Sequence, residues 1–279
     1  MILNTPPNFA WAYAASGTCT GSTVSTEFGS WTSIATSIPG NSDLVIVHPG
    51  LVSSGTTSNA VLDIGTKYNG DSDYTTIIDK LLVGWQAASA TSTTMRPYVF
   101  PLRIPAARGS NALTNIGIRC RHDASAGTVL ARVQLYGGNS NPEYFWVGTG
   151  VESQGIGTNN YGTSVVSGTT WAMGTWTDIG SATTRPYRAV VLIAANHNAT
   201  VGSGVDNMGL LGYGVSGAGT AGRTLASYEH RITVSEVGGG FHSSPYQLCN
   251  IPEGAQLSVT GTRNLGTALT IDYAVWGVY

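Results

Sequence analysis

The strongest constraint on the fold is a short phrase that occurs twice. The stretch "GSWTSI" at Gly29–Ile34 returns as "GTWTDI" at Gly174–Ile179, with four of six positions identical and an offset of 145 residues in a chain of 279. A phrase that returns after about half of the chain predicts two copies of one folding unit, because self-similarity at a fixed spacing is how repeated units appear in a sequence.

Further segments match in the same order and extend the repeat over nearly the whole chain. They are 16–18 with 161–163, 44–48 with 189–193, 61–65 with 210–214, 102–109 with 249–256, and 127–138 with 266–277. We therefore expect two homologous domains, at 1–139 and 140–279. The boundary falls in "YGGNSNPEY", a cluster of Gly, Asn and Pro that suits a linker.

Each half is expected to be all-β. The apolar runs "DLVIVH" and "RAVVLIAA" predict central strands, whereas "TVLARVQLYG" alternates and predicts a strand with one buried face. The segment "YTTIIDKLLVGW" fits either a strand or a short helix. About eight strands in about 140 residues indicate a β-sandwich. We prefer a jelly roll to an immunoglobulin-like sandwich, since the Cys–Trp–Cys spacing of antibody domains is absent.

The charge content argues for a protein that works in an assembly. Charged residues make up 10% of the chain and the net charge is −2, so no global field attracts nucleic acid or an anionic membrane. A surface this poor in charge is weakly protected against association. The start of the sequence resembles no signal peptide, and no apolar run is long enough to span a membrane, so we expect synthesis in a cytoplasm without conventional secretion.

The sequence contains few motifs that suggest chemistry. One GxGxxG occurs at 217–222, but a strand-like run follows it where a dinucleotide fold needs a helix. The turn "NGDSD" offers Asp71 and Asp73 as oxygen ligands, yet it lacks the Gly and Glu that complete a calcium loop. A solvated turn is the expected structure there, with a weak calcium site as the alternative.

Catalysis and metal binding receive no support either. The three cysteines form no CxxC pair, and the five histidines form no HxH or HExxH motif. The phrase "GTCTG" around Cys19 is a poor nucleophile elbow, because the strand and helix that flank such an elbow are not predicted. We therefore expect no cofactor, no metal and no catalytic residue.

Aromatic residues are the remaining signal. Trp31 and Trp176 occupy equivalent positions of the repeat, so we expect both to be largely buried and to serve the fold. The N-terminal "FAWAYAA" is a candidate docking arm, with Phe9, Trp11 and Tyr13 as the contacting residues, that would add a strand to a neighbour's sheet edge. Its own domain is the alternative docking surface.

The phrase "IPEGAQLSVTGTRNLGTALTIDYAVWGVY" and its counterpart "IPAARGSNALTNIGIRCRHDASAGTVLARVQLYGG" resemble a pattern of tailed-phage virion proteins. There an Ile-Pro turn leads into a strand, and a closing strand ends in an aromatic residue and Gly. The resemblance covers about a quarter of the chain and implies a tandem jelly-roll structural protein, either a capsid decoration (cement) protein or a tail-associated one. It carries over no catalytic residues.

Three functional hypotheses follow from these observations. The first is a non-enzymatic decoration protein, located in the virion and made in the host cytoplasm. Its partners would be the major capsid protein, other virion proteins and further copies of the chain, with a trimer as one possible oligomer. The second is a carbohydrate-binding receptor or adsorption module of a tail or fibre. The third is an enzyme that degrades glycans.

Overall fold

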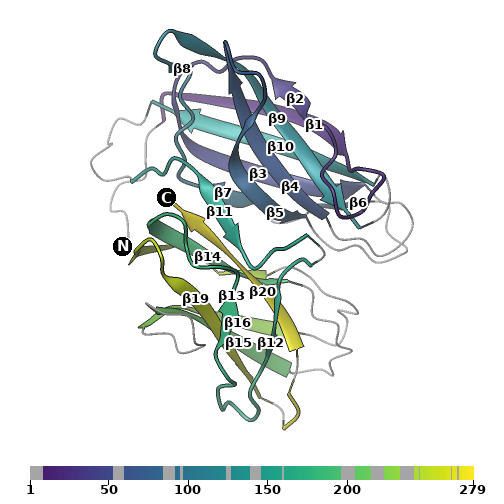
Figure 1. Ribbon diagram of the computed structural model, residues 1–279, viewed down its shortest axis with the longest axis vertical. Coiled ribbons are helices and arrows are strands. Elements are labelled where there is room, and N and C mark those ends of the chain that lie inside the picture. The colour runs from purple at the N-terminus through teal and green to yellow at the C-terminus, as the bar shows by residue number, and fades with distance from the viewer. Residues whose placement is uncertain are drawn as a thin grey trace. The chain divides into compact units, whose positions relative to one another are not determined.

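A computed structural model shows a chain built from β-strands (Figure 1). It describes residues 9–52, 60–83, 92–94, 97–123, 127–138, 146–158, 160–195, 205–214, 223–232, 242–244, 246–264, 266–268 and 270–279. The chain divides into two compact units, Met1–Val151 and Glu152–Tyr279, whereas the sequence placed the division at 139/140. The described residues contain no helix that is long and apolar enough to cross a membrane.

The strands of the first unit run from purple to teal in Figure 1. They are β1 (Trp11–Thr20), β2 (Thr32–Ala35), β3 (Ser42–Val52), β4 (Ala60–Tyr68), β5 (Thr75–Val83), β6 (Ser92–Thr94), β7 (Tyr98–Phe100), β8 (Ala107–Arg108), β9 (Asn111–His122), β10 (Thr128–Gly137) and the start of β11 (Val151–Gln154).

The first unit is a jelly roll. One sheet has the order β1-β10-β3, and β6 and β7 continue it by pairing with successive stretches of β3. The other sheet has the order β5-β4-β9-β2, and the short β8 forms a hairpin with β9. This interleaved order is the double Greek key of a jelly-roll sandwich.

The second unit repeats this strand order. Its strands are β12 (Thr163–Val166), β13 (Thr177–Ile179), β14 (Tyr187–Ala195), β15 (Val205–Gly214), β16 (Arg223–Ile232), β17 (His242–Ser243), β18 (Gln247–Ile251), β19 (Gln256–Arg263) and β20 (Thr270–Val278). One sheet runs β12-β20-β14 with β17 and β18 beside β14, and the other runs β13-β19-β15-β16. The all-β, jelly-roll prediction is therefore confirmed for both units. Common descent of the two stays a prediction.

Strand registers test the alignment of the two halves in detail. In β4 and β9, Val61 lies opposite Arg121, and in β15 and β19, Leu210 lies opposite Thr260. Val61 and Leu210 are equivalent under the sequence alignment, so the registers match Arg121 with Thr260, which both lie outside the aligned segments. The last strand differs: Leu44 lies opposite Tyr136, but its counterpart Ala189 lies opposite Val278. Tyr136 thus matches Val278, which corrects the alignment of 127–138 by three residues.

Alternation along the strands builds each core. In β10, Val129, Ala131, Val133 and Leu135 are buried, and the residues between them are more exposed. The segment 75–83, ambiguous in sequence, is the strand β5. In the second unit burial is nearly continuous along β19 and along most of β14 and β20, and the largest core residues include Tyr187, Leu192, Leu257 and Tyr273.

Candidate functional site

The predicted docking arm lies against its own unit. Trp11 and Tyr13 belong to β1, which pairs with β10, and the Phe9 ring centroid lies 5.6 Å from that of Tyr136. The Trp11 indole packs against Gly137, where a side chain would collide with it. All three aromatic side chains are half-buried. Docking of these residues on a neighbour stays a prediction.

The weaker motifs fall on turns and on the core. The GxGxxG lies outside the described residues, and β16 follows it directly. Asp71 accepts a hydrogen bond from the Tyr68 N–H, and Asp73 accepts one from the Tyr74 N–H, so both carboxylates take part in hydrogen bonds of the turn. Among the described residues no cluster of three or more His, Cys, Asp or Glu could hold a metal ion.

Cys19 is a core residue of β1. Its side chain is fully buried in β1, and Cys120 of β9 is buried beside it, with the Cys120 Sγ 3.5 Å from the Cys19 carbonyl oxygen. A hydrogen bond with the Cys120 thiol, together with burial, raises the pKa of Cys19 well above its usual value. The thiol therefore stays protonated, unlike the thiolate that a nucleophile requires.

The most unusual surface of the first unit is the outer face of the sheet β5-β4-β9-β2. Gly65 of β4 and Gly117 of β9 lie directly opposite each other in its two central strands. A Cβ at Gly65 would lie 2.7 Å from the Trp31 ring, and one at Gly117 would lie 2.5 Å from the Tyr74 ring. Two aromatic side chains thus reach over the sheet from its opposite edges, because two glycines leave room for them.

Trp31 and Tyr74 stack on each other above these glycines. Their ring centroids are 4.9 Å apart with an angle of 23° between the planes. Trp31 directly precedes β2, as Trp176 directly precedes β13, and both are half-buried. Trp31 lies on the outer face of its sheet, and neither tryptophan belongs to the fully buried core, whereas the sequence predicted both to be largely buried.

An arginine extends the stack. The Arg119 Cζ atom lies 4.6 Å from the centre of the Trp31 ring and 4.7 Å from that of Phe28. The Arg119 Nε donates a 2.9 Å hydrogen bond to Asp63 Oδ2, and its Nη2 lies 2.8 Å from the same oxygen. Arg119 is therefore fixed by a carboxylate and by two aromatic rings, an arrangement that its planar guanidinium favours.

Asp63 also holds a β-bulge between β4 and β5. The register shifts there, and Asp63 Oδ1 accepts a 2.9 Å hydrogen bond from the N–H of Lys80, whose φ is +48°. The Asp63 side chain is 1% exposed. This burial raises the pKa of the Asp63 carboxyl above its usual value, although the Lys80 N–H and Arg119 act in the opposite direction.

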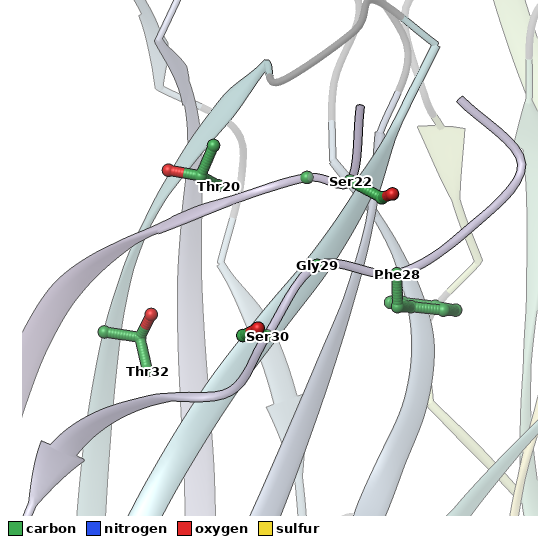
Figure 2. A pocket seen from close by; sticks show the side chains of 7 residues that line it. Thr20, Ser22, Phe28, Gly29, Ser30 and Thr32 are labelled. Atoms are coloured by element: carbon green, nitrogen blue, oxygen red, sulfur yellow. The ribbon is translucent and has the colours of Figure 1, made fainter. Parts of the chain in front are cut away.

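A pocket of about 380 Å³ opens beside this cluster. It lies between the end of β1 and the loop that leads to β2, with the Phe28 ring at one end and Thr20 and Thr32 at the other (Figure 2). Ser22 and Ser30 add two more hydroxyl groups, and the lining includes no charged side chain. Hydroxyls next to one aromatic ring suit a small, neutral, polar ligand.

Sequence reasoning missed this cluster, although one signal was visible. Asp63 lies in the apolar run "VLDIG", and an aspartate that is buried in such a run needs a partner. Its partner Arg119 becomes a neighbour only through the register of β4 with β9.

Comparisons with known proteins assign no family. No family model and no curated protein matches the chain. Among solved structures, the STIV MCP is 10% identical, covers 94% of this chain and 97% of its own, and gives a TM-score of 0.33.

Two further solved structures are about as distant. A peptide-N(4)-(N-acetyl-β-D-glucosaminyl) asparagine amidase is 9% identical, with 96% of each chain covered and a TM-score of 0.32. The tandem CBM22 domains of Xyn10C from Paenibacillus barcinonensis are 10% identical, cover 98% of this chain and 94% of their own, and give a TM-score of 0.26. Similarities this weak carry no inference about function.

Proposed function

We propose that the chain is a non-enzymatic structural protein of a phage virion, in particular a decoration protein that bridges neighbouring coat subunits. The observation that supports it is the pair of jelly-roll units with the same strand order in one chain that has 10% charged residues. The sequence resemblance to tailed-phage virion proteins points to the same role.

The mechanism would be mechanical. Each copy would bury uncharged surface against coat subunits and so oppose the separation of those subunits under internal pressure. Sandwich domains suit this work because their hydrogen-bonded sheets resist deformation along the strands. Closed symmetry is the usual arrangement of such assemblies.

Particles made with and without the chain test this proposal. We expect the protein to be visible on intact particles in negative-stain images, and particles without it to open at a lower temperature or a smaller osmotic shock. Particles that carry no copy of the protein, or that are equally stable without it, would contradict the decoration role.

The pocket beside Phe28 favours a second candidate, a carbohydrate-binding module. Its four hydroxyl-bearing side chains and one aromatic ring could contact a neutral sugar. Trp31 is a poor platform for the same purpose, since Tyr74 and Arg119 already contact its ring.

A glycan array with the wild-type chain and the Phe28→Ala variant separates the two candidates. Specific binding of a sugar that is lost in Phe28→Ala, with particle stability unchanged, would favour the carbohydrate-binding module. An array without hits, together with weakened particles, would favour the decoration protein.

A further inference from the structure

The loop between β12 and β13 of the second unit is closed at its neck by two glycines. The N–H groups of Gly168 and Gly174 both donate 2.8 Å hydrogen bonds to the Gly261 carbonyl of β19. A Cβ at Gly168 would collide with the Ala172 carbonyl, and one at Gly174 would lie 2.5 Å from the Val166 carbonyl. A compact loop whose ends meet in this way keeps one conformation.

The tip of this loop has an unusual backbone. Thr170 and Trp171 are adjacent non-glycine residues with φ of +53° and +64°. A non-glycine residue in this region is strained and persists only where the surrounding contacts enforce it. Here the Trp171 N–H donates a 2.7 Å hydrogen bond to the Arg263 carbonyl, which holds the tip against the end of β19.

The strained tip presents apolar side chains to solvent. Val166 is 56% exposed, Trp171 50% and Met173 39%. No charged residue occurs from 166 to 176. A rigid, exposed tryptophan next to other apolar groups is the usual composition of an interface hot spot, because little conformational entropy is lost when it binds.

A sheet edge adjoins the loop directly. β12 ends at Val166, where the loop begins, and within the described strands it pairs only with β20. Its other edge therefore carries backbone N–H and C=O groups that no described strand satisfies. The strand Thr163–Val166 contains neither a charged residue nor a proline, the usual devices that protect an edge from pairing.

We propose that this surface, the β12 edge with the 166–176 loop, binds the same surface of a second copy of the chain. The C-terminal ends of the two β12 edges would pair antiparallel about a two-fold axis near Val166, which brings Val166, Trp171 and Met173 of each copy towards those of the other. Asp272 of β20 adjoins this surface and accepts a hydrogen bond from the Ser164 hydroxyl, but β12 and the loop carry no charged side chain of their own, so they bring no like charges together when the surface pairs with its own copy. A lipid surface fits less well, since loops and helices that bind membranes carry Lys or Arg beside their aromatic residues.

This dimer contact deepens the proposed assembly role by naming one partner, and it rests on that role only in supposing that copies of the chain meet.

Sedimentation velocity over a range of concentrations tests whether the chain dimerises through this surface. We expect the wild-type chain to dimerise and Trp171→Ala to weaken the dimer by at least about 30-fold, the effect of losing a hot-spot side chain. The matched control is Leu248→Ala, which removes a side chain that is 55% exposed on β18, and it should leave the dimer unchanged.

Cysteine cross-linking tests the two-fold geometry. Ser164→Cys and Val166→Cys place a thiol on the exposed side of β12, and residues close to a two-fold axis meet their own copies. We expect at least one of the two to give a disulfide-linked dimer under mild oxidation by diamide, and the control Val99→Cys on β7 to give none.

Three results would overturn the inference. They are a wild-type chain that stays monomeric at every concentration, a dimer that Trp171→Ala does not weaken, and cross-linking by Val99→Cys alone. If the chain is monomeric but Trp171→Ala loosens its attachment to particles, the occupant is a coat protein and not a second copy. Particle stability is measured separately, so the decoration role can fail or hold independently of this contact.

Discussion

The two units place different side chains at equivalent positions of the same sheet. In the first unit Asp63 lies opposite Arg119 in a buried ion pair, and in the second unit Gly212 lies opposite Ser258. A register shift occurs at both positions, between Leu62 and Ile64 in β4 and at Gly212 in β15. The backbone irregularity is shared, whereas an ion pair occupies these positions only in the first unit.

The loops that lead into β2 and β13 differ in the same manner. Both contain a glycine that packs against backbone, Gly29 against the Thr20 carbonyl and Gly174 against the Val166 carbonyl. Between these fixed points the first unit presents a pocket lined by hydroxyls and Phe28, and the second presents Trp171. The glycines that return in "GSWTSI" and "GTWTDI" therefore serve the fold. In each unit, the variable residues of the loop that ends at this glycine form a surface of their own.

Removal of the arginine from the first unit should have the largest effect. Arg119→Met leaves the Asp63 carboxylate buried without its charged partner, which should lower the free energy of unfolding by about 3–5 kcal/mol. The equivalent change in the second unit, Ser258→Ala, removes one hydrogen bond to Asp178 and should cost about 1 kcal/mol. Urea unfolding followed by tryptophan fluorescence measures both. Equal losses in the two variants would contradict a specialised first unit.

The glycines at the loop necks should behave alike in the two units. Gly29→Ala and Gly174→Ala each force a Cβ against a backbone carbonyl, which moves less easily than a side chain. We expect each to lower the free energy of unfolding by about 2 kcal/mol, in the range of overpacking. Gly254→Ser is the control for a turn glycine. Open space surrounds the position of its added Cβ, so this substitution adds only the backbone strain of a φ of +79°. A neutral result for either neck variant would show that the loop can open there.

The strands and the all-β, jelly-roll class were predictable from the sequence, and the surface cluster was not. Alternating and continuous apolar runs such as 44–48 and 189–193 depend on neighbours in the chain, so they identify strands. The stack of Tyr74, Trp31 and Arg119 depends on which strands lie side by side and in which register. Gly65 and Gly117, which make room for the two rings, are far apart in the sequence and become neighbours only in the folded sheet. Trp171 was visible as an aromatic residue in an uncharged segment, but its exposure depends on the backbone of the loop.

The destabilisation caused by Arg119→Met should depend on pH, because the carboxylate that it leaves unpaired in the first unit, Asp63, can take up a proton. Burial raises the pKa of Asp63 above its value in the unfolded chain, so the folded state binds this proton more readily. Its contribution to stability therefore increases as the pH falls through the folded pKa towards the unfolded value near 4. We expect the destabilisation of Arg119→Met to shrink between pH 7 and pH 4.5, measured against the wild type at each pH. An unchanged difference would mean that Asp63 is not the charge left unpaired.

The smallest effect is expected at the motif position that differs between the two copies. Ser33 is exposed, and its Oγ lies 2.8 Å from Asn115 Oδ1 in a contact that water can replace. Its counterpart Asp178 accepts a 2.8 Å hydrogen bond from Ser258, whose side chain is 2% exposed. Ser33→Ala should therefore change the free energy of unfolding by less than about 0.5 kcal/mol, while Asp178→Ala leaves a buried hydroxyl without its acceptor and should cost about 1–2 kcal/mol. The same urea titration resolves the two variants. If Ser33→Ala costs as much as Asp178→Ala, the outer face of the first unit depends on this position too, and the difference between the units is smaller than the ion pair suggests.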